Sequence, residues 1–176
     1  MKTSITVVLD RSGSMGTVRD DAIGGFNTFL EGQQRDADGT TMTLTQFDNE
    51  YDILCVDRPV EEIAPLDSTT YVPRGATALN DAIGRTIGEL DARLARCGPG
   101  ERPEQVLFVV LTDGHENASR EFTTEQVREL VERHERKYGW TFVYLAADVD
   151  AFAEASMRGI RADRAYQFSK EAGKPG

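Results

Sequence analysis

The sequence predicts an α/β fold: a doubly wound, mostly parallel sheet with helices on both faces. Two observations lead to this prediction. Short apolar segments alternate along the chain with longer segments of helical periodicity, and right-handed crossovers then place the helices on both faces. Only three residues separate the predicted strands at 40–47 and 51–56, so these two strands must form a hairpin and run antiparallel.

Six strands are expected. Segments 5–9 and 105–111 are short, apolar on both faces and rich in β-branched residues, which is typical of strands buried inside a sheet. Segment 40–47 alternates in the way of a strand with two different faces. The remaining strands are predicted at 51–56, 140–146 and 165–168.

Four helices are expected between these strands. The clearest spans 78–94 and carries one apolar stripe, whereas Gly24 and Gly25 weaken the predicted helix at 18–35. A short helix is expected at 150–158, where Asp148 and Asp150 are interpreted as helix-capping residues near its start.

The remaining helix, which comes third in the chain, follows a predicted capping box formed by Thr123 and Gln126. Its apolar face has the spacing of a helix that packs on a sheet. The residues of that face are Val127, Leu130, Val131, His134 and Tyr138. His134 is therefore interpreted as a core or boundary residue.

Size and charge limit the classes of function. The 176 residues allow one domain, expected over 1–169, and a flexible tail at 170–176. The net charge of −10 argues against nucleic acid as a partner, because phosphates need a basic face, and favours cations. Cys55 and Cys97 have neither zinc-site nor disulfide spacing, which predicts reduced thiols in a cytoplasmic protein. The first apolar run is too short for a signal peptide or a membrane span. A monomer is the favoured oligomeric state.

Polar residues with oxygen-bearing side chains follow the two most apolar strands. Asp10, Ser12 and Ser14 lie at alternate positions of a glycine-containing turn after the first strand. Asp113 follows the strand at 105–111, and Thr77 comes just before the clearest helix. Ligands of such folds bind at the carboxyl ends of the strands, so these three loops are expected to converge. Hard oxygen ligands suit Mg²⁺, Mn²⁺ or Ca²⁺, and the sequence therefore predicts a metal site.

When each of these residues is considered by itself, a structural role in a turn or a helix cap remains an alternative to metal binding. Ser12, Ser14 and Thr77 could be turn or N-cap residues, which are common before helices. Asp113 could begin an ordinary turn. Asp10 is the least ambiguous, because a carboxylate at the end of a buried strand needs compensation.

The chain resembles the von Willebrand factor A (vWA) domains, whose metal-ion-dependent adhesion site (MIDAS) uses an Asp-x-Ser-x-Ser motif, a distant Thr and a distant Asp. All five residues are present in the family's order, at Asp10, Ser12, Ser14, Thr77 and Asp113. The resemblance covers essentially the whole chain. The chain most resembles the small stand-alone vWA proteins of bacteria and phages, because segments similar to 112–117 and 144–151 recur in those proteins.

This resemblance implies a Rossmann-like, six-stranded sheet in the order 3-2-1-4-5-6, with the antiparallel strand at one edge. It also implies that Ser12 and Ser14 bind the metal directly, and that Thr77 does so in the ligand-competent arrangement and through water otherwise. Asp10 and Asp113 would act mainly through waters and hydrogen bonds. Neutral hydroxyl ligands would leave the ion electron-poor and able to attract a partner's carboxylate; Mg²⁺ is favoured, and Mn²⁺ and Ca²⁺ are alternatives.

The function expected from these observations is a non-enzymatic, metal-dependent protein-binding module of adhesion or scaffold type. Its partner would be a protein that presents an Asp or Glu. Arg11, His115 and Glu116 are candidate rim residues for that contact, and a solvated loop is the alternative for His115 and Glu116. The alternative is a metal-assisted hydrolase or phosphoryl-transfer enzyme at the same site. No well-placed general base and no Gly-x-Ser-x-Gly elbow support the enzyme. A third possible class of function is a purely structural subunit with a vestigial metal site. The presence of all five site residues argues against it.

Overall fold

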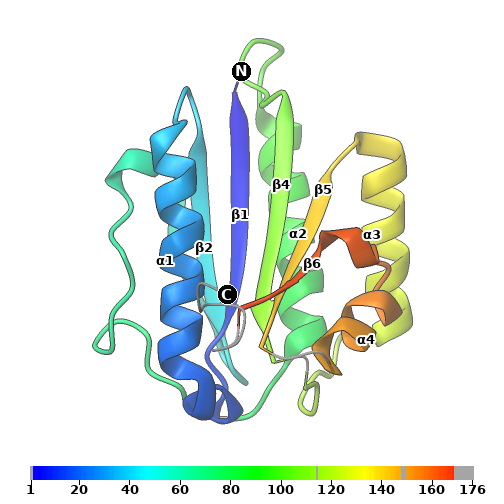
Figure 1. Cartoon of the computed structure of the whole chain (residues 1–176). Coiled ribbons are helices and arrows are strands. Elements are labelled where there is room, and N and C mark those ends of the chain that lie inside the picture. The colour runs from blue at the N-terminus through cyan, green and yellow to red at the C-terminus, as the bar shows by residue number, and fades with distance from the viewer. Residues whose placement is uncertain (1, 114, 148–149, 169–176) are drawn as a thin grey trace.

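The computed structural model describes residues 2–113, 115–147 and 150–168. Six strands form one sheet in the order β3-β2-β1-β4-β5-β6 (Figure 1). Only β2 and β3 pair antiparallel; the other four strand pairs are parallel. The strands are β1 (Thr3–Asp10), β2 (Thr41–Phe47), β3 (Tyr51–Pro59), β4 (Gln105–Thr112), β5 (Thr141–Ala146) and β6 (Ala165–Gln167). The predicted fold class, strand order and antiparallel edge strand are confirmed.

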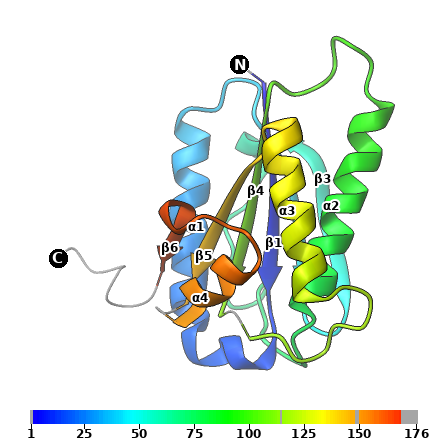
Figure 2. The same cartoon turned by 90° about the vertical axis from the view of Figure 1, so that its right-hand side faces the viewer.

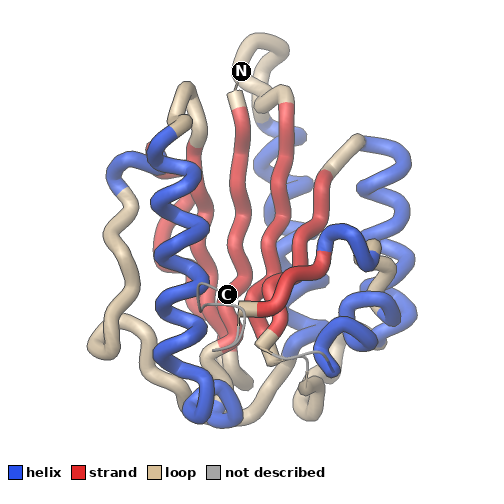
Figure 3. The backbone as a smooth tube through the Cα atoms, viewed as in Figure 1, coloured by secondary structure: helices blue, strands red, loops and turns tan. Residues whose placement is uncertain are grey.

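Helices cover both faces of this sheet. Figure 2 shows α1 (Arg19–Arg35) on one side and α2 (Leu79–Arg96) and α3 (Thr124–Tyr138) on the other. The short α4 (Asp150–Met157) lies beside α3 and β5. The three layers of helix, sheet and helix are seen in Figure 2, and Figure 3 shows the strands in red with the helices in blue. Three short 3-10 helices complete the described elements, namely η1 (Gly13–Val18), η2 (Val60–Glu62) and η3 (Ala162–Arg164).

The central strand β1 is buried on both faces, which is why most of its residues from Ile5 to Leu9 are apolar. Successive side chains of a strand point to opposite faces. Val8 packs in the core beneath α2 and α3, whereas Val7 and Leu9 pack in the core beneath α1. The same division applies to β4, and β1 and β4 therefore form the rigid centre of the sheet.

Two local predictions differ from the structure. The strand predicted at 51–56 continues to Pro59, because irregular pairing with β2 breaks its alternation and Asp57 takes a left-handed conformation with φ of 48°. Tyr138 does not belong to the buried face of α3 and is 56% exposed. His134 is buried, as predicted, and the predicted capping box at the start of α3 is present.

Three regions named in the sequence analysis lie outside the described residues: Gly114, Asp148 and the tail at 170–176. Asp150 begins α4, but its side chain is likewise not described. Within the described residues, no helix is long and apolar enough to cross a membrane.

The paired glycines of α1 allow a matched test of its packing. A Cβ added to Gly25 would lie 2.9 Å from Cβ of Phe168, whereas one added to Gly24 would meet no atom within 4 Å. We expect Gly24→Ala to raise the free energy of unfolding by about 0.5–1 kcal/mol through reduced backbone entropy. Gly25→Ala should instead lower it by about 1–3 kcal/mol through overpacking. Urea unfolding measures both, and equal stabilisation by the two variants would contradict the contact.

Candidate metal centre

The candidate site lies where β1 and β4 end, at the lower edge of the sheet in Figure 1. These strands are parallel neighbours, and their register pairs Leu9 with Leu111. The next residues along the two strands are therefore adjacent, and the Thr112 hydroxyl donates a 2.6 Å hydrogen bond to Oδ2 of Asp10. The sheet itself thus brings the first and third predicted loops together.

Asp10 is completely buried at the end of β1. Its Oδ1 accepts a 2.7 Å hydrogen bond from the backbone N–H of Ser12, and the Tyr71 hydroxyl donates to its backbone carbonyl. Burial raises the pKa of this carboxyl group to about 6, although the hydrogen bonds from Thr112 and Ser12 act in the opposite direction. The negative charge of Asp113 adds to the increase. The hydrogen bonds therefore compensate the buried charge only in part, and a cation beside it would favour its ionised form.

The two serines connect the two carboxylates. Their hydroxyl oxygens lie 3.1 Å apart, and Ser14 donates a hydrogen bond from its hydroxyl to Oδ2 of Asp113. The other oxygen of Asp113 accepts from the backbone N–H of His115 at 3.2 Å. Asp10, Ser12 and Asp113 are buried, whereas Ser14 is exposed. The cluster formed by Asp10, Ser12, Ser14 and Asp113 is thus accessible from solvent at Ser14.

Helix capping does not account for these hydroxyl groups. Ser12 precedes η1, but its side chain makes no capping hydrogen bond, and Ser14 lies within that helix. The N-cap of α1 is Val18, and that of α2 is Ala78 rather than Thr77. Ser14 and Thr77 are therefore not N-cap residues, whereas Ser12 holds the N-cap position of η1 without a capping hydrogen bond from its side chain.

Backbone hydrogen bonds hold the second loop against the first. The N–H of Gly13 donates to the carbonyl of Gly75 at 2.9 Å, and the N–H of Arg74 donates to the carbonyl of Arg11 at 2.7 Å. Gly75 has a φ of 72°, and a Cβ there would collide with Oδ1 of Asn49. Glycine is thus required two residues before Thr77.

A second set of hydrogen bonds joins Thr77 to the third loop. The Thr77 N–H donates to Oδ1 of Asn117 at 2.8 Å, and the Asn117 N–H donates back to the Thr77 carbonyl at 2.9 Å. The N–H of Ala118 also donates to this carbonyl, at 3.0 Å. Thr77 is buried between the two loops as a result. All five predicted ligand residues therefore lie on three loops that are bonded to one another.

The three candidate rim residues differ in position. Arg11 is only 6% exposed, and its guanidinium forms ion pairs with Asp48 at 3.5 Å and Asp52 at 2.7 Å. Glu116 accepts hydrogen bonds from the backbone N–H groups of Asn80, Ala118 and Ser119. Both side chains therefore hold loops in place. His115 is exposed and is the one of the three that a partner can reach.

Sequence reasoning did not identify several residues that position the site. Thr112 and Asn117 both lie in the motif at 112–117. The available signals were the position of Thr112 next to Asp113 and the position of Asn117 within the motif. Tyr71 lies in a long loop and gives no periodic signal. Arg158 is 1% exposed, which no sequence pattern indicates for a charged residue. It donates to Oδ1 of Asn80 at 2.8 Å and thereby ties the end of α4 to the helix that follows Thr77.

The donor set consists of oxygen atoms only. Two carboxylates and three hydroxyl-bearing residues are available at the three loops, and the described residues contain no cluster of three or more His, Cys, Asp or Glu that could hold a metal. A set with few carboxylates fits an ion that keeps several waters, as Mg²⁺ does. The buried charge of Asp10 and its raised pKa are consistent with a cation at this place.

Comparison with known proteins identifies the fold. No family model and no curated protein matches the sequence. The structure resembles the manganese-loaded TRAP protein of Plasmodium vivax, with a TM-score of 0.70 and 16% identity over 98% of this chain and 70% of that one. It also resembles proximal thread matrix protein 1 of the mussel byssus with a zinc-occupied MIDAS motif (TM-score 0.60, 17% identity, 94% and 41% covered). A third similar structure contains the N-terminal domains of the pilus tip protein Mfa5 of Porphyromonas gingivalis (0.66, 9%, 97% and 47%).

The chain spans less than half the length of the mussel and pilus proteins. At these identities the likeness establishes the fold, which is the Rossmann-like fold of vWA domains with the strand order described above.

The raised pKa of Asp10 predicts a pH dependence of the metal-free protein. Between its ordinary pKa of 3.8 and the folded value of about 6, the folded state binds more protons than the unfolded state, so this group destabilises the fold as the pH rises. Asp10→Asn removes that cost. We expect the free energy of unfolding of the variant, relative to wild type in EDTA, to increase by about 2 kcal/mol between pH 4.5 and pH 7.

The control for this experiment is Asp20→Asn, since the Asp20 side chain is 86% exposed. Denaturant unfolding at both pH values measures the difference, and the contribution of other titrating groups cancels between variant and wild type. A difference between Asp10→Asn and wild type that is independent of pH would show that Asp10 titrates normally in the folded protein.

Proposed function

We propose that this chain, a vWA-type fold with three converging oxygen-rich loops, is a metal-dependent protein-binding module of adhesion or scaffold type. The proposed ligand residues are Asp10, Ser12, Ser14, Thr77 and Asp113. The observation that carries the proposal is a chain of contacts from buried Asp10 to Asp113: Asp10 accepts from the backbone N–H of Ser12, the hydroxyls of Ser12 and Ser14 are in contact, and Ser14 donates to Asp113. A cluster of oxygen atoms that solvent can reach on one side suits a cation that also binds a carboxylate of another protein.

The contacts favour a division of roles within the site. Both oxygens of Asp10 already accept hydrogen bonds, from Ser12 and Thr112, and Asp113 accepts one from Ser14. We infer that the two carboxylates act through waters and hydrogen bonds, and that Ser12, Ser14 and Thr77 supply the direct ligands. A bound divalent cation would supply an electron-poor position for a partner's Asp or Glu. Mg²⁺ is the proposed ion, with Mn²⁺ and Ca²⁺ as alternatives.

Similar structures support a divalent ion without naming it, since one is manganese-loaded and another has zinc at its MIDAS motif. We propose that the module is not an enzyme, because its buried carboxylates already accept hydrogen bonds that organise the loops. We also propose a cytoplasmic protein of bacterial or phage type. The free cysteines Cys55 and Cys97 support a reducing compartment.

The proposed site predicts stabilisation by metal. Mg²⁺ added to metal-stripped protein at a hundredfold excess over its Kd should raise the free energy of unfolding by about 2.7 kcal/mol, which corresponds to about 5–10 °C in Tm. Ser12→Ala should abolish this increase, because it removes a direct ligand. Ser68→Ala, which makes the same change at an exposed loop position, should retain it. Differential scanning calorimetry measures all three; an unchanged wild-type Tm contradicts the site.

The partner-binding role is tested by affinity purification from native cells. A partner captured by wild-type protein in Mg²⁺ should be lost in EDTA and recovered when Mg²⁺ is restored. Ser12→Ala protein should fail to capture it under either condition. Capture that persists unchanged in EDTA would rule out a bridging metal.

A further inference from the structure

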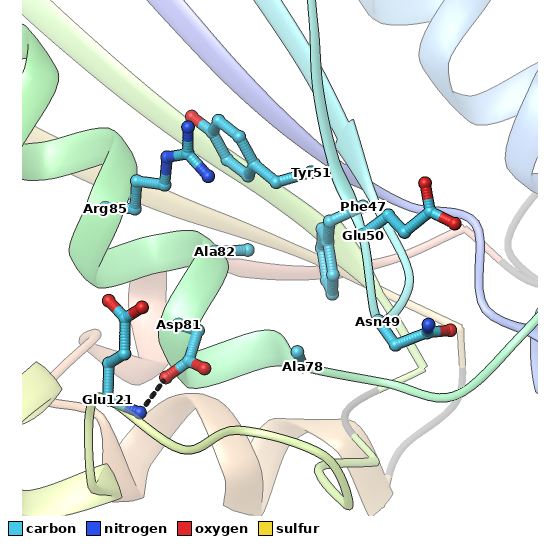
Figure 4. Close-up of a pocket in the computed structure, with 9 residues that line it drawn as sticks. All are labelled: Phe47, Asn49, Glu50, Tyr51, Ala78, Asp81, Ala82, Arg85 and Glu121. Carbon is cyan, nitrogen blue, oxygen red and sulfur yellow. Dashed lines mark hydrogen bonds between the residues drawn. The ribbon is translucent and has the colours of Figure 1, made fainter.

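The first turn of α2 comes just after the proposed metal ligand Thr77 and is held from two sides. On one side the Asp81 carboxylate accepts hydrogen bonds from backbone N–H groups of the loop before α3, among them that of Glu121 (Figure 4). On the other side the Asn80 side chain accepts a hydrogen bond from Arg158, which follows α4. The position of this turn, and with it that of Thr77, therefore depends on α4 as well as on the metal-site loops.

Asn80 is a buried junction between these elements, only 3% exposed. Its backbone N–H donates to Oε1 of Glu116 at 2.8 Å, and its side-chain amide donates to Oγ1 of Thr124 at 3.1 Å. Its Oδ1 accepts from Nε of Arg158 at 2.8 Å. The bonds to Thr124 and Arg158 together fix the orientation of the amide group. One residue in the first turn of α2 thus joins the third loop, the start of α3 and α4.

The Arg158 guanidinium is 1% exposed, and such a buried charge is costly unless it is paired and hydrogen-bonded. Its Nη1 donates to Oε2 of Glu154 at 2.8 Å and to the backbone carbonyl of the same residue at 3.0 Å. Glu154 therefore supplies the opposite charge, and the separate bond from Nε is directed at Asn80. A planar guanidinium makes both contacts at fixed angles. Arg158 is thus built to connect α4 with α2.

The buried hydroxyl of Tyr144 on β5 relates Arg158 to the metal-site carboxylates. This hydroxyl has no hydrogen-bond partner in the part of the chain that the structure describes. Burial raises its pKa, the charge of Arg158 lowers it, and the charges of Asp10 and Asp113 raise it. The same buried group therefore lies within electrostatic range of Arg158 and of both carboxylates, which places the end of α4 close behind the metal site.

We propose that Arg158 is a positioning residue of the metal site: through Asn80 it holds the first turn of α2 so that the Thr77 hydroxyl binds the ion directly. This inference rests on the proposed function and extends it to a residue outside the three loops. When the bond to Asn80 is lost, the turn relaxes and a water replaces the Thr77 hydroxyl, since octahedral ions such as Mg²⁺ keep waters readily. The serine ligands stay in place because they belong to a different loop.

Mn²⁺ binding to the whole chain tests this role, because water-proton relaxation reports both the affinity and the hydration of the bound ion. Arg158→Met retains much of the side-chain volume but removes the donors. We expect it to weaken Mn²⁺ binding about ten- to a hundred-fold, as is typical of residues that orient metal ligands, and to add a water to the ion. Arg161→Met makes the same change at an arginine whose side chain is 58% exposed and should alter neither quantity. Wild-type affinity and hydration in Arg158→Met would overturn the proposal.

Glu154→Gln distinguishes positioning from a purely structural role. It removes the charge that compensates Arg158 and should lower the free energy of unfolding, which urea unfolding measures, but it retains the bond to Asn80. We expect Mn²⁺ bound to this variant to have the hydration of the wild type. If both variants lose Mn²⁺ affinity only in proportion to their loss of stability, with unchanged hydration, Arg158 merely stabilises the fold and the proposal fails.

Asn80→Ala removes the same contact from the other side and decides the question even if Arg158→Met does not fold. We expect a similar loss of affinity and the same added water, and no further loss in the double variant, because both changes break one interaction. Additive losses, or wild-type behaviour of Asn80→Ala, would contradict the proposal. If the wild-type protein itself binds no Mn²⁺, the proposed function fails; if it binds Mn²⁺ and the variants match it, only the role of Arg158 fails.

Discussion

The buried carboxylate of Asp10 is the constraint on which the site depends. It lies at the end of the central strand, completely shielded from water, where an ionised group is costly. Hydrogen bonds from Ser12 and Thr112 offset part of this cost, but the pKa still rises to about 6. Such a buried group carries an energetic cost, and a cation bound beside it would offset that cost. The burial that destabilises the ionised carboxylate would therefore favour the proposed metal.

The loops around Asp10 are arranged by their backbones more than by their side chains. Gly13 bonds to Gly75, and Thr77 bonds in both directions to Asn117, so the positions of the hydroxyl groups follow from main-chain geometry. Buried Arg158 adds a link from α4 to the first turn of α2. A site fixed in this way loses little conformational entropy when it binds a ligand, which favours affinity.

The sequence predicted the parts of the molecule that rest on simple periodicity. The apolar segments at 5–9 and 105–111 became β1 and β4, and the three-residue connection correctly predicted the hairpin. It did not predict the full length of β3, because irregular pairing and the left-handed Asp57 interrupt its alternation. Tyr138 is the last residue of α3 before the C-cap Gly139; its ring lies 5.4 Å from that of His134, yet the residue stays 56% exposed at the end of the helix.

The sequence named candidate ligand residues, and the structure joins their loops through contacts that the sequence did not indicate. Ser and Thr before a helix suit capping and metal binding equally well. The N-caps of α1 and α2 are Val18 and Ala78, whereas Ser12 is the N-cap of η1 but makes no capping hydrogen bond with its side chain. The contribution of Tyr71 depends on how a long loop folds back to Asp10, which local sequence does not encode. Conversely, charge alone did not reveal that Arg11 is buried between Asp48 and Asp52.

The central claim is that one divalent cation binds between these loops, and anomalous X-ray diffraction from crystals soaked in Mn²⁺ tests it most directly. The account predicts one strong anomalous peak within about 2.5 Å of the hydroxyl oxygens of Ser12 and Ser14, a distance at which oxygen binds such ions directly. Crystals of the Ser12→Ala variant should lack that peak. A peak elsewhere, or none at full Mn²⁺ saturation, would contradict the account.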